Sequence, residues 1–394
     1  MAQAIRLAMS ELAEQAERPE DWLRLIRSRR VGPATFYRLL AEHGSVAAAL
    51  AALPGIARSA GVDGYEACPT GVIARELSDG HKVGATPLLW AQPGYPVALT
   101  EVPDAPPVLW ALGDLSLLAR PMVAMVGARN ASSLGLRMAR RLAEGLGETG
   151  QVVVSGLARG IDAEAHRAAL PTGTVAVLAG GVDVAYPEEN ADLLAEIAQS
   201  GCVVSEQPPG CQPQTRHFPM RNRIISGMAR GVVVVEAAAR SGSLITARDA
   251  ADQGRDVLAV PGHPFDARAA GCNRLLRDGA ILVRGPQDVL EALNIGGGGG
   301  VGGQGALALR AVPKVGSAPE PRPVAARPAP QDLPEGDLPA AILDRLGPSP
   351  LAEDQLIRDL GLTPQAIAPA LLLLELEGRV LRQPGGLLSR TDQG

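Results

Sequence analysis

Glycine, serine and arginine residues close or follow the short valine-rich runs in the middle of the chain. The positions are Gly127, Arg129 and Ser132 at the first run, Ser155, Gly156 and Arg159 at the next, Gly180 at the third, and Ser241, Gly242 and Ser243 after the fifth. Glycine lets a backbone approach a ligand closely, and hydroxyls and free N–H groups at a helix start bind anions. The pattern therefore predicts an anion-binding surface. The alternative is plain helix capping, which favours the same residue types.

A second candidate segment, residues 218–231 (FPMRNRIISGMARG), places an aromatic ring among arginines. The candidate residues there are Arg216, Phe218, Arg221, Asn222 and Arg223, and residues 216–255 hold seven arginines against three acids. This combination is typical of single-strand binding, because bases stack on the ring while guanidinium groups follow the phosphates. The alternative is that Phe218 anchors a loop and that some arginines are structural partners of Glu206 and Glu236.

Two sets of side chains are candidates for catalysis. Asp162 and His166 are four residues apart, on one helical face, and with Ser155 they could form a proton relay. Asp162 stands where a helix N-cap is expected, however, and His166 lies among alanines on a helix that must pack on a sheet. Capping and a core histidine are the preferred interpretation. Glu206 and Glu236 could act as an acid–base pair, but no nucleophile accompanies them.

Signatures of nucleotide cofactors and metals are missing from the sequence. The segment GARNASSLG at residues 127–135 is not the G-x-G-x-x-G fingerprint, and no Walker motif occurs. Four cysteines, Cys68, Cys202, Cys211 and Cys272, are widely spaced, without a C-x-x-C pair or a histidine at ligand spacing. We therefore predict no cofactor, no metal and no catalysis.

Short apolar strands alternating with helices must position the candidate residues. The predicted strands are residues 123–126, 152–155, 175–178, 203–205, 232–236, 257–260 and 281–283, with helical periodicity between them, as in 134–146 and 244–253. Continuous apolar strands separated by helices indicate a parallel sheet covered on both faces. The predicted fold class is α/β, with a Rossmann-like, doubly wound and mainly parallel sheet. Ligands of such sheets bind beyond the carboxyl ends of the strands.

Two further modules flank this core. Residues 1–85 are expected to form a helical SAM-like or helix-hairpin-helix module, with breaks near Gly32 and Gly44, ahead of the Rossmann-like domain at 86–294. Residues 295–334 read as a Gly/Pro-rich flexible linker. Residues 335–394 predict a winged-helix-like domain: helices at 339–346, 352–360 and 363–377, then a hairpin at 379–390 that turns at Pro384.

The overall charge is acidic. The 394 residues carry a net charge of -5, which taken alone argues against a protein that coats nucleic acid. Residues 335–394 hold nine acids and five arginines, so much of the negative charge lies beyond the linker. The third helix there carries no arginine or lysine, which favours protein binding over DNA reading. The acid-bearing N-terminus and the lack of a long apolar stretch predict a cytoplasmic protein without a membrane partner.

Several long motifs occur in series. SGLARGIDAEAHRAAL, LAGGVDVAYPEEN, SEQPPG, FPMRNRIISG, VVVVEAAARSGSLITA and GRDVLAVPG follow in this order within residues 88–293. In type and order they resemble the DprA/Smf family of DNA-processing proteins. The resemblance implies sequence-independent binding of single-stranded DNA in the cytoplasm, protection of incoming strands and loading of RecA recombinase during natural transformation. It also implies a homodimer formed through the Rossmann-like domain, and no catalysis.

The resemblance assigns roles to particular residues. Gly127 and Arg129 match the family's G-S-R motif, with Arg129 in the phosphate-binding role, while Ala128 replaces the serine. Phe218 matches the aromatic of an F-P-x-R-N-R motif, and Thr215 stands where many members have lysine.

Two other functions remain as alternatives. A Rossmann-like nucleotide hydrolase, releasing base from a nucleoside monophosphate, would suit the Gly-rich edge with Glu206 and Glu236. The segment SGSLITARD is only weakly similar to the P-G-G-x-G-T-x-x-E motif that is typical of such hydrolases. A protein-binding scaffold is the third hypothesis, and it would bind no oligonucleotide.

Overall fold

The computed structural model describes residues 18–59, 61–295, 338–346, 350–383 and 387–391. The chain divides into two compact units, Met1–Gly302 and Gly303–Gly394. Nearly all of the predicted linker, and the predicted turn at Pro384, lie outside the described residues. Each unit is described by itself.

A nine-stranded sheet forms the centre of the first unit, in the order β1-β2-β6-β5-β4-β3-β7-β8-β9. The strands are β1 (Thr86–Leu89), β2 (Val108–Gly113), β3 (Met122–Val126), β4 (Val152–Ser155), β5 (Thr174–Val177), β6 (Cys202–Ser205), β7 (Gly231–Val234), β8 (Asp256–Ala259) and β9 (Ile281–Leu282). Strands β3 to β9 pair in parallel, which confirms the predicted core. The two antiparallel strands β1 and β2 extend one edge and were not predicted.

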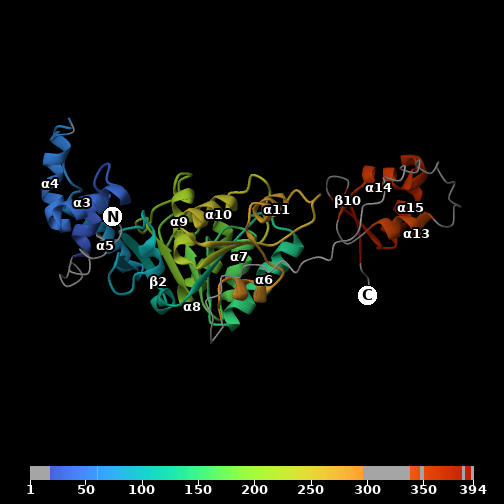
Figure 1. Ribbon diagram of the computed structural model, residues 1–394, viewed down its shortest axis with the longest axis horizontal. Coiled ribbons are helices and arrows are strands. Elements are labelled where there is room, and N and C mark those ends of the chain that lie inside the picture. The colour runs from blue at the N-terminus through green and yellow to red at the C-terminus, as the bar shows by residue number, and fades with distance from the viewer. Residues whose placement is uncertain (1–17, 60, 296–337, 347–349, 384–386, 392–394) are drawn as a thin grey trace, which may run out of the picture. The chain divides into compact units, whose positions relative to one another are not determined.

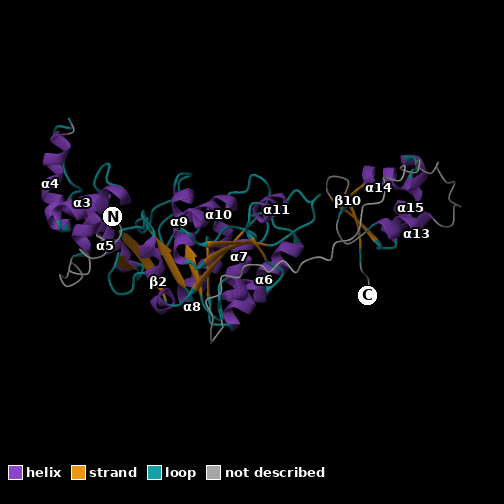
Figure 2. Cartoon of the chain, in the orientation of Figure 1, coloured by secondary structure: helices purple, strands orange, loops and turns teal. Residues whose placement is uncertain are grey.

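Helices cover both faces of this sheet (Figures 1 and 2). Helices α6 (Ser133–Glu148), α7 (Ile161–Ala169) and α8 (Ala191–Ser200) lie on one face, and α9 (His217–Met228), α10 (Ser243–Asp252) and α11 (Ala270–Arg277) lie on the other. Helix α12 (Pro286–Ala292) shares a buried core with α6. The valines of β4 and β7 are fully buried, as expected for strands covered on both sides. The strand order reverses at β3, so β3 and β7 flank the switch point of the sheet.

The N-terminal helices pack on the β1–β2 end of the sheet. They are α2 (Pro19–Arg27), α3 (Pro33–His43), α4 (Val46–Ser59) and α5 (Thr70–Lys82), and the gaps between the first three fall at the predicted breaks. The carboxylate of Glu76 on α5 accepts hydrogen bonds from Arg27 (2.9 Å) and from the Trp110 indole on β2 (3.0 Å). One continuous hydrophobic core therefore joins these helices to the sheet.

The second unit has the predicted winged-helix arrangement. It contains α13 (Leu338–Arg345), β10 (Leu351–Ala352), α14 (Glu353–Leu360), α15 (Pro364–Leu376), β11 (Val380–Gln383) and β12 (Leu387–Arg390). The three strands form a small antiparallel sheet in the order β10-β12-β11. Arg382 on β11 pairs with Glu353 (2.5 Å) and Glu375 (2.7 Å), which ties the hairpin to α14 and α15.

Among the described residues, no single helix is long and apolar enough to span a bilayer. Helices α3 and α4 reach that length and composition only as a pair, and the pair is bent by 104°.

Candidate nucleic-acid interface

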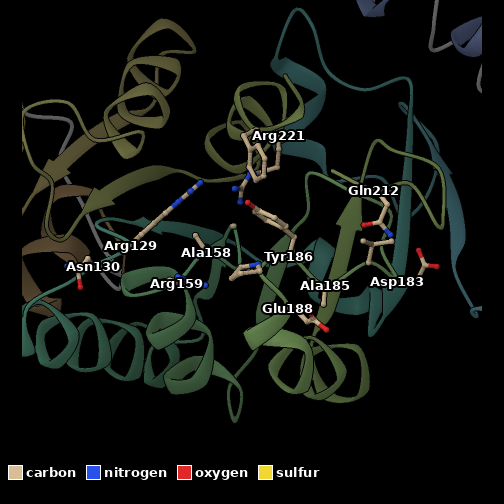
Figure 3. Close-up of a pocket in the computed structure, with 14 residues that line it drawn as sticks. Arg129, Asn130, Ala158, Arg159, Asp183, Ala185, Tyr186, Glu188, Gln212 and Arg221 are labelled. Atoms are coloured by element: carbon tan, nitrogen blue, oxygen red, sulfur yellow. The ribbon is translucent and has the colours of Figure 1, made fainter. Parts of the chain in front are cut away.

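A pocket of about 930 Å³ opens at the carboxyl ends of β3, β4 and β5. Five of the predicted site residues line it: Arg129, Gly156, Arg159, Phe218 and Arg221 (Figure 3). Its other wall comes from the loop after β5, residues 183–188, and from Asn130, Ala158 and Gln212. The strand-end loops thus converge where a doubly wound sheet binds its ligands.

Arg221 forms a fixed cation in the wall of this pocket. Its side chain extends from α9 into the protein, where the residue is 7% exposed and Nη1 donates a hydrogen bond to the Val177 carbonyl (3.2 Å). Burial lowers the pKa of Arg221, and the nearby Asp162 carboxylate opposes that shift. Gly156 leaves the space that this guanidinium fills, since a Cβ at that position would collide with Nη1. Gly156 therefore makes room for an arginine as well as for a ligand.

Two aromatic rings and a second arginine form the open side of the pocket. Phe218 is the second residue of α9, and its ring centroid lies 5.3 Å from that of Tyr186, with the planes tilted by 56°. Cζ of Arg129 lies 5.8 Å from the centroid of the Phe218 ring, within cation–π range. Tyr186 is 48% exposed. The arrangement offers ring faces for stacking and guanidinium groups for phosphates.

Arg159 stands at the rim with a partner of its own. It pairs with Glu189 at 2.6 Å, and both side chains are about half exposed. Exposed pairs of this kind contribute only about 0–1 kcal/mol, so a ligand phosphate can replace the glutamate at little cost.

The position that holds a nucleotide phosphate in many Rossmann-like folds is filled by the chain itself. At the switch point, the backbone N–H of Ser132 donates to Glu236 (3.0 Å), and the Ser132 hydroxyl donates to the same carboxylate (2.5 Å). The Glu236 carboxylate thus lies at the N-terminus of α6, in the place of a bound anion, while the Ser132 hydroxyl caps the helix by accepting from the Gly135 N–H (3.0 Å). Ser132 contributes to this internal contact and does not line the pocket. Gly127 is half-buried and packs on Ile161, and it does not line the pocket either.

The remaining predicted residues lie outside the pocket lining. Ser155 is fully buried and donates to the Met125 carbonyl (2.6 Å), Gly180 packs against the backbone of Cys211, and Ser241 and Ser243 share a hydrogen bond (2.7 Å). Gly242, Arg216 and Asn222 also line no part of the pocket.

Arg223 has structural partners. Its guanidinium contacts Glu206 (2.6 Å) and Asp104 (3.2 Å), and its side chain is only 11% exposed. This geometry favours the structural alternative for Arg223.

In the conceivable relay of Ser155, Asp162 and His166, the Ser155 side chain lies beside the Asp162 carboxylate, but the described contact of the His166 ring is with Thr174. The N-cap of α7 is Gly160, so the expectation that Asp162 caps this helix is wrong. Its carboxylate instead accepts from the N–H groups of Gly156 (3.2 Å) and Ala158 (3.4 Å), and holds the loop after β4. His166 is fully buried, 2.7 Å from the Thr174 hydroxyl, and burial lowers its pKa to about 3. Within the described ranges, no group of His, Cys, Asp or Glu side chains has the arrangement of a metal site.

Comparison with known proteins extends the geometric argument. The family model described as DNA recombination-mediator protein A matches residues 86–294, slightly more than half of the chain. The models described as the DprA-like N-terminal HHH domain and the DprA winged helix domain match residues 16–78 and 324–386. This chain belongs to the DprA/Smf family.

Similar proteins of this family come from several bacteria. DNA processing protein DprA of Streptococcus pneumoniae is 50% identical over 198 residues, which is 50% of this chain and 70% of that protein. DprA of Bacillus subtilis is 44% identical over 202 residues, 50% of this chain and 68% of that protein. Protein Smf of Escherichia coli is 45% identical over 205 residues, which is 51% of this chain and 55% of that protein.

Two solved structures share the fold. The S. pneumoniae DprA structure superposes with a TM-score of 0.55 at 36% identity, covering 74% of this chain and 93% of that one. The DNA processing protein A of Helicobacter pylori superposes with a TM-score of 0.50 at 30% identity, covering 54% of this chain and 96% of that one. The latter was solved to describe its mode of binding single-stranded DNA.

Sequence reasoning missed several pocket residues, of which Tyr186 is the most informative. It lies in the stretch LAGGVDVAYPEEN, after the predicted strand that ends near Gly180. The chain has only four tyrosines, so a tyrosine at a strand end was a usable signal. Asp183 and Glu188 share this loop and bring acids to the rim of the pocket.

Proposed function

We propose that this chain binds single-stranded DNA without sequence preference, protects incoming strands and passes them to RecA recombinase during natural transformation. The observation that carries the proposal is the pair of rings, Phe218 and Tyr186, in one pocket with the guanidinium groups of Arg129 and Arg221. Rings hold bases by their faces, and guanidinium groups hold phosphates, so neither contact depends on which base is bound. In a duplex the base faces are already stacked, and the rings have nothing to bind.

Family membership supports the later steps of the proposal. The matched family is described as a recombination mediator, and the H. pylori relative is described by its single-stranded DNA binding. Delivery of strands to RecA, a homodimer formed through the Rossmann-like domain and action in the cytoplasm are therefore part of the same proposal.

The winged-helix domain has a separate role in this proposal. Leu372 and Leu373 of α15 are exposed, and the helix carries no cation. A helix of this kind repels phosphates and suits a protein surface or another part of its own chain.

The proposal includes no catalytic step. Glu236 is hydrogen bonded to Ser132, and Glu206 is paired with Arg223, so both glutamates of the hydrolase alternative have internal partners. Incubation with nucleoside monophosphates tests this part directly: no free base is expected, and sustained release of base would favour the hydrolase.

A binding assay with a matched pair of variants tests the main claim. Fluorescence anisotropy with labelled oligo-dT is expected to show tighter binding than to a duplex of the same length. Phe218→Ala should weaken oligo-dT binding by about 5- to 150-fold, the effect of losing one stacked base at about 1–3 kcal/mol. Phe218→Trp keeps a ring and should stay near the wild type. Equal loss in both variants, or no preference for single strands, would contradict the proposal.

A further inference from the structure

The aromatic side chains of this protein fall into two groups. The chain has ten, all within the described residues, and seven are buried: Trp22, Phe36, Tyr37, Tyr65, Trp90, Tyr95 and Trp110. The other three are Tyr186, Phe218 and Phe265. Tyr186 follows β5, Phe218 begins the helix that follows β6, and Phe265 lies in the loop after β8. All three therefore lie at the carboxyl edge of the sheet, although only the first two line the pocket.

Phe265 is unusually open to solvent. It is 93% exposed, more than any other large hydrophobic residue described, and the four residues before it are exposed as well. Its ring lies 5.6 Å from that of His263, tilted by 46°. A single exposed apolar residue is ordinary on a protein surface. What distinguishes Phe265 is that it shares an edge with the two pocket rings in a chain that otherwise buries its aromatics.

The loop that carries Phe265 is held in place. The side chain of Asn273 on α11 donates to the Gly262 carbonyl (3.0 Å) and accepts from the Gly262 N–H (3.2 Å). On the other side of Phe265, Asp266 accepts from the backbone N–H of Arg268 (2.9 Å) and pairs with its guanidinium (3.3 Å). The ring is thus presented on an anchored turn, which limits the ordering cost of stacking on it.

Hydrogen bonds link the strand-end loops that lie between the pocket and the loop of Phe265. Glu236 at the end of β7 bonds to Ser132 in the loop that carries Arg129, and Ala237 accepts from the N–H of Gly271 at the start of α11 (2.7 Å). Arg240, between the two aromatic sites, is exposed. Three strand spacings separate β4 from β8, which amounts to about 14 Å. At about 3.4 Å per stacked nucleotide, that distance corresponds to about four nucleotides.

We infer that Phe265 is a second stacking site, which holds a base of the same DNA strand about four nucleotides beyond the base at Phe218 and Tyr186. The inference rests on the proposed function and extends it along the sheet edge. The strand enters the pocket over β4, crosses the loops after β3 and β7 past Arg240, and reaches the ring after β8.

Oligonucleotide length separates the two sites. A strand of about four nucleotides fills the pocket without reaching Phe265, whereas one of about sixteen reaches both. Phe265→Ala should weaken binding of the long oligo-dT by about 5- to 150-fold and leave the short one unchanged. Phe218→Ala should weaken both. Because Phe265 contacts solvent on nearly all sides, its replacement should leave the unfolding transition unchanged.

A fluorescent variant reports stacking directly. Trp22, Trp90 and Trp110 are all buried, so in Phe265→Trp the added indole is the exposed fluorophore. Its emission should be quenched by the long oligo-dT and not by the short one.

The outcomes of these experiments are distinct. If Phe265→Ala leaves every length unchanged while the wild type binds, the second site is refuted, the pocket stands, and the exposed ring is left for a protein partner. Equal weakening at both lengths would also refute it, because the residue would then act through the pocket. If the wild type binds no oligonucleotide at all, the proposed function itself fails.

Discussion

Replacement of Gly156 by alanine should disable the pocket through a residue on another element. The new methyl group collides with Nη1 of Arg221, so the guanidinium must leave the place from which it donates to the Val177 carbonyl. A hydrogen bond to a charged group contributes about 1.5–3 kcal/mol. The same range applies to the phosphate contact that Arg221 would lose, so oligo-dT binding should weaken by about 10- to 150-fold.

A double-mutant cycle shows whether Arg221 carries this effect. In an Arg221→Ala background the methyl group has space, so Gly156→Ala should weaken oligo-dT binding little further. The effects of the two changes on the binding free energy should therefore be far from additive. Anisotropy with labelled oligo-dT measures all four proteins. Gly71→Ala on α5 is the matched control, since a Cβ there meets nothing within 4 Å, and its binding should equal the wild type. Equal weakening by Gly156→Ala in both backgrounds would refute the reasoning.

Three other changes have defined outcomes. Tyr186→Ala removes the ring and should weaken oligo-dT binding by about 5- to 150-fold, whereas Tyr186→Phe keeps the ring and should not weaken it. An equal loss of affinity in both variants would assign the effect to the hydroxyl. Glu236→Ala strips the α6 N-terminus of its anion and should destabilise the fold by about 1–3 kcal/mol, with partial recovery in sulfate seen by urea denaturation. His166 has a pKa of about 3 in the fold and about 6.5 in the unfolded chain, so below about pH 6.5 only the unfolded chain takes up the proton. The free energy of unfolding should therefore be unaffected by His166 above about pH 6.5 and fall by up to about 1.4 kcal/mol per pH unit below it. Urea titrations give the free energy of unfolding at each pH, and between about pH 6 and pH 5 it should change less steeply with pH in His166→Asn than in the wild type. An unchanged pH dependence would mean that His166 is protonated in the fold.

The order of strands and loops was predictable because it depends on residue types that are close together in the sequence. Valine-rich runs interrupted by glycine and serine gave the parallel strands, and their ends gave Arg129 and Gly156 as residues of one edge. The strands β1 and β2 were missed, since runs such as TPLL and VLWALG do not share the valine-rich pattern.

The pairing of charges was not predictable, because the partners are distant in sequence. Ser132 and Glu236 are 104 residues apart. The sequence made Ser132 a candidate for anion binding and Glu236 a candidate for an acid–base pair or an arginine partner, whereas the fold places the two in contact. Arg223 and Arg221 looked alike in the sequence, but residues two positions apart on a helix face different sides of it. Arg221 therefore enters the pocket, whereas Arg223 contacts Glu206 and Asp104. Local sequence identifies which residue types reach an edge, and only tertiary contacts decide which of them remain open to a ligand.

The salt dependence of oligo-dT binding tests the central claim most directly. Each phosphate held by an arginine contributes about −0.7 to the slope of log affinity against log salt for a single strand. Arg129→Ala should bind more weakly and flatten that slope by about 0.7, while Arg277→Ala, an exposed arginine at the far end of α11, should match the wild type. If Arg129→Ala leaves both the affinity and the slope unchanged, the pocket at the carboxyl edge does not hold the DNA strand.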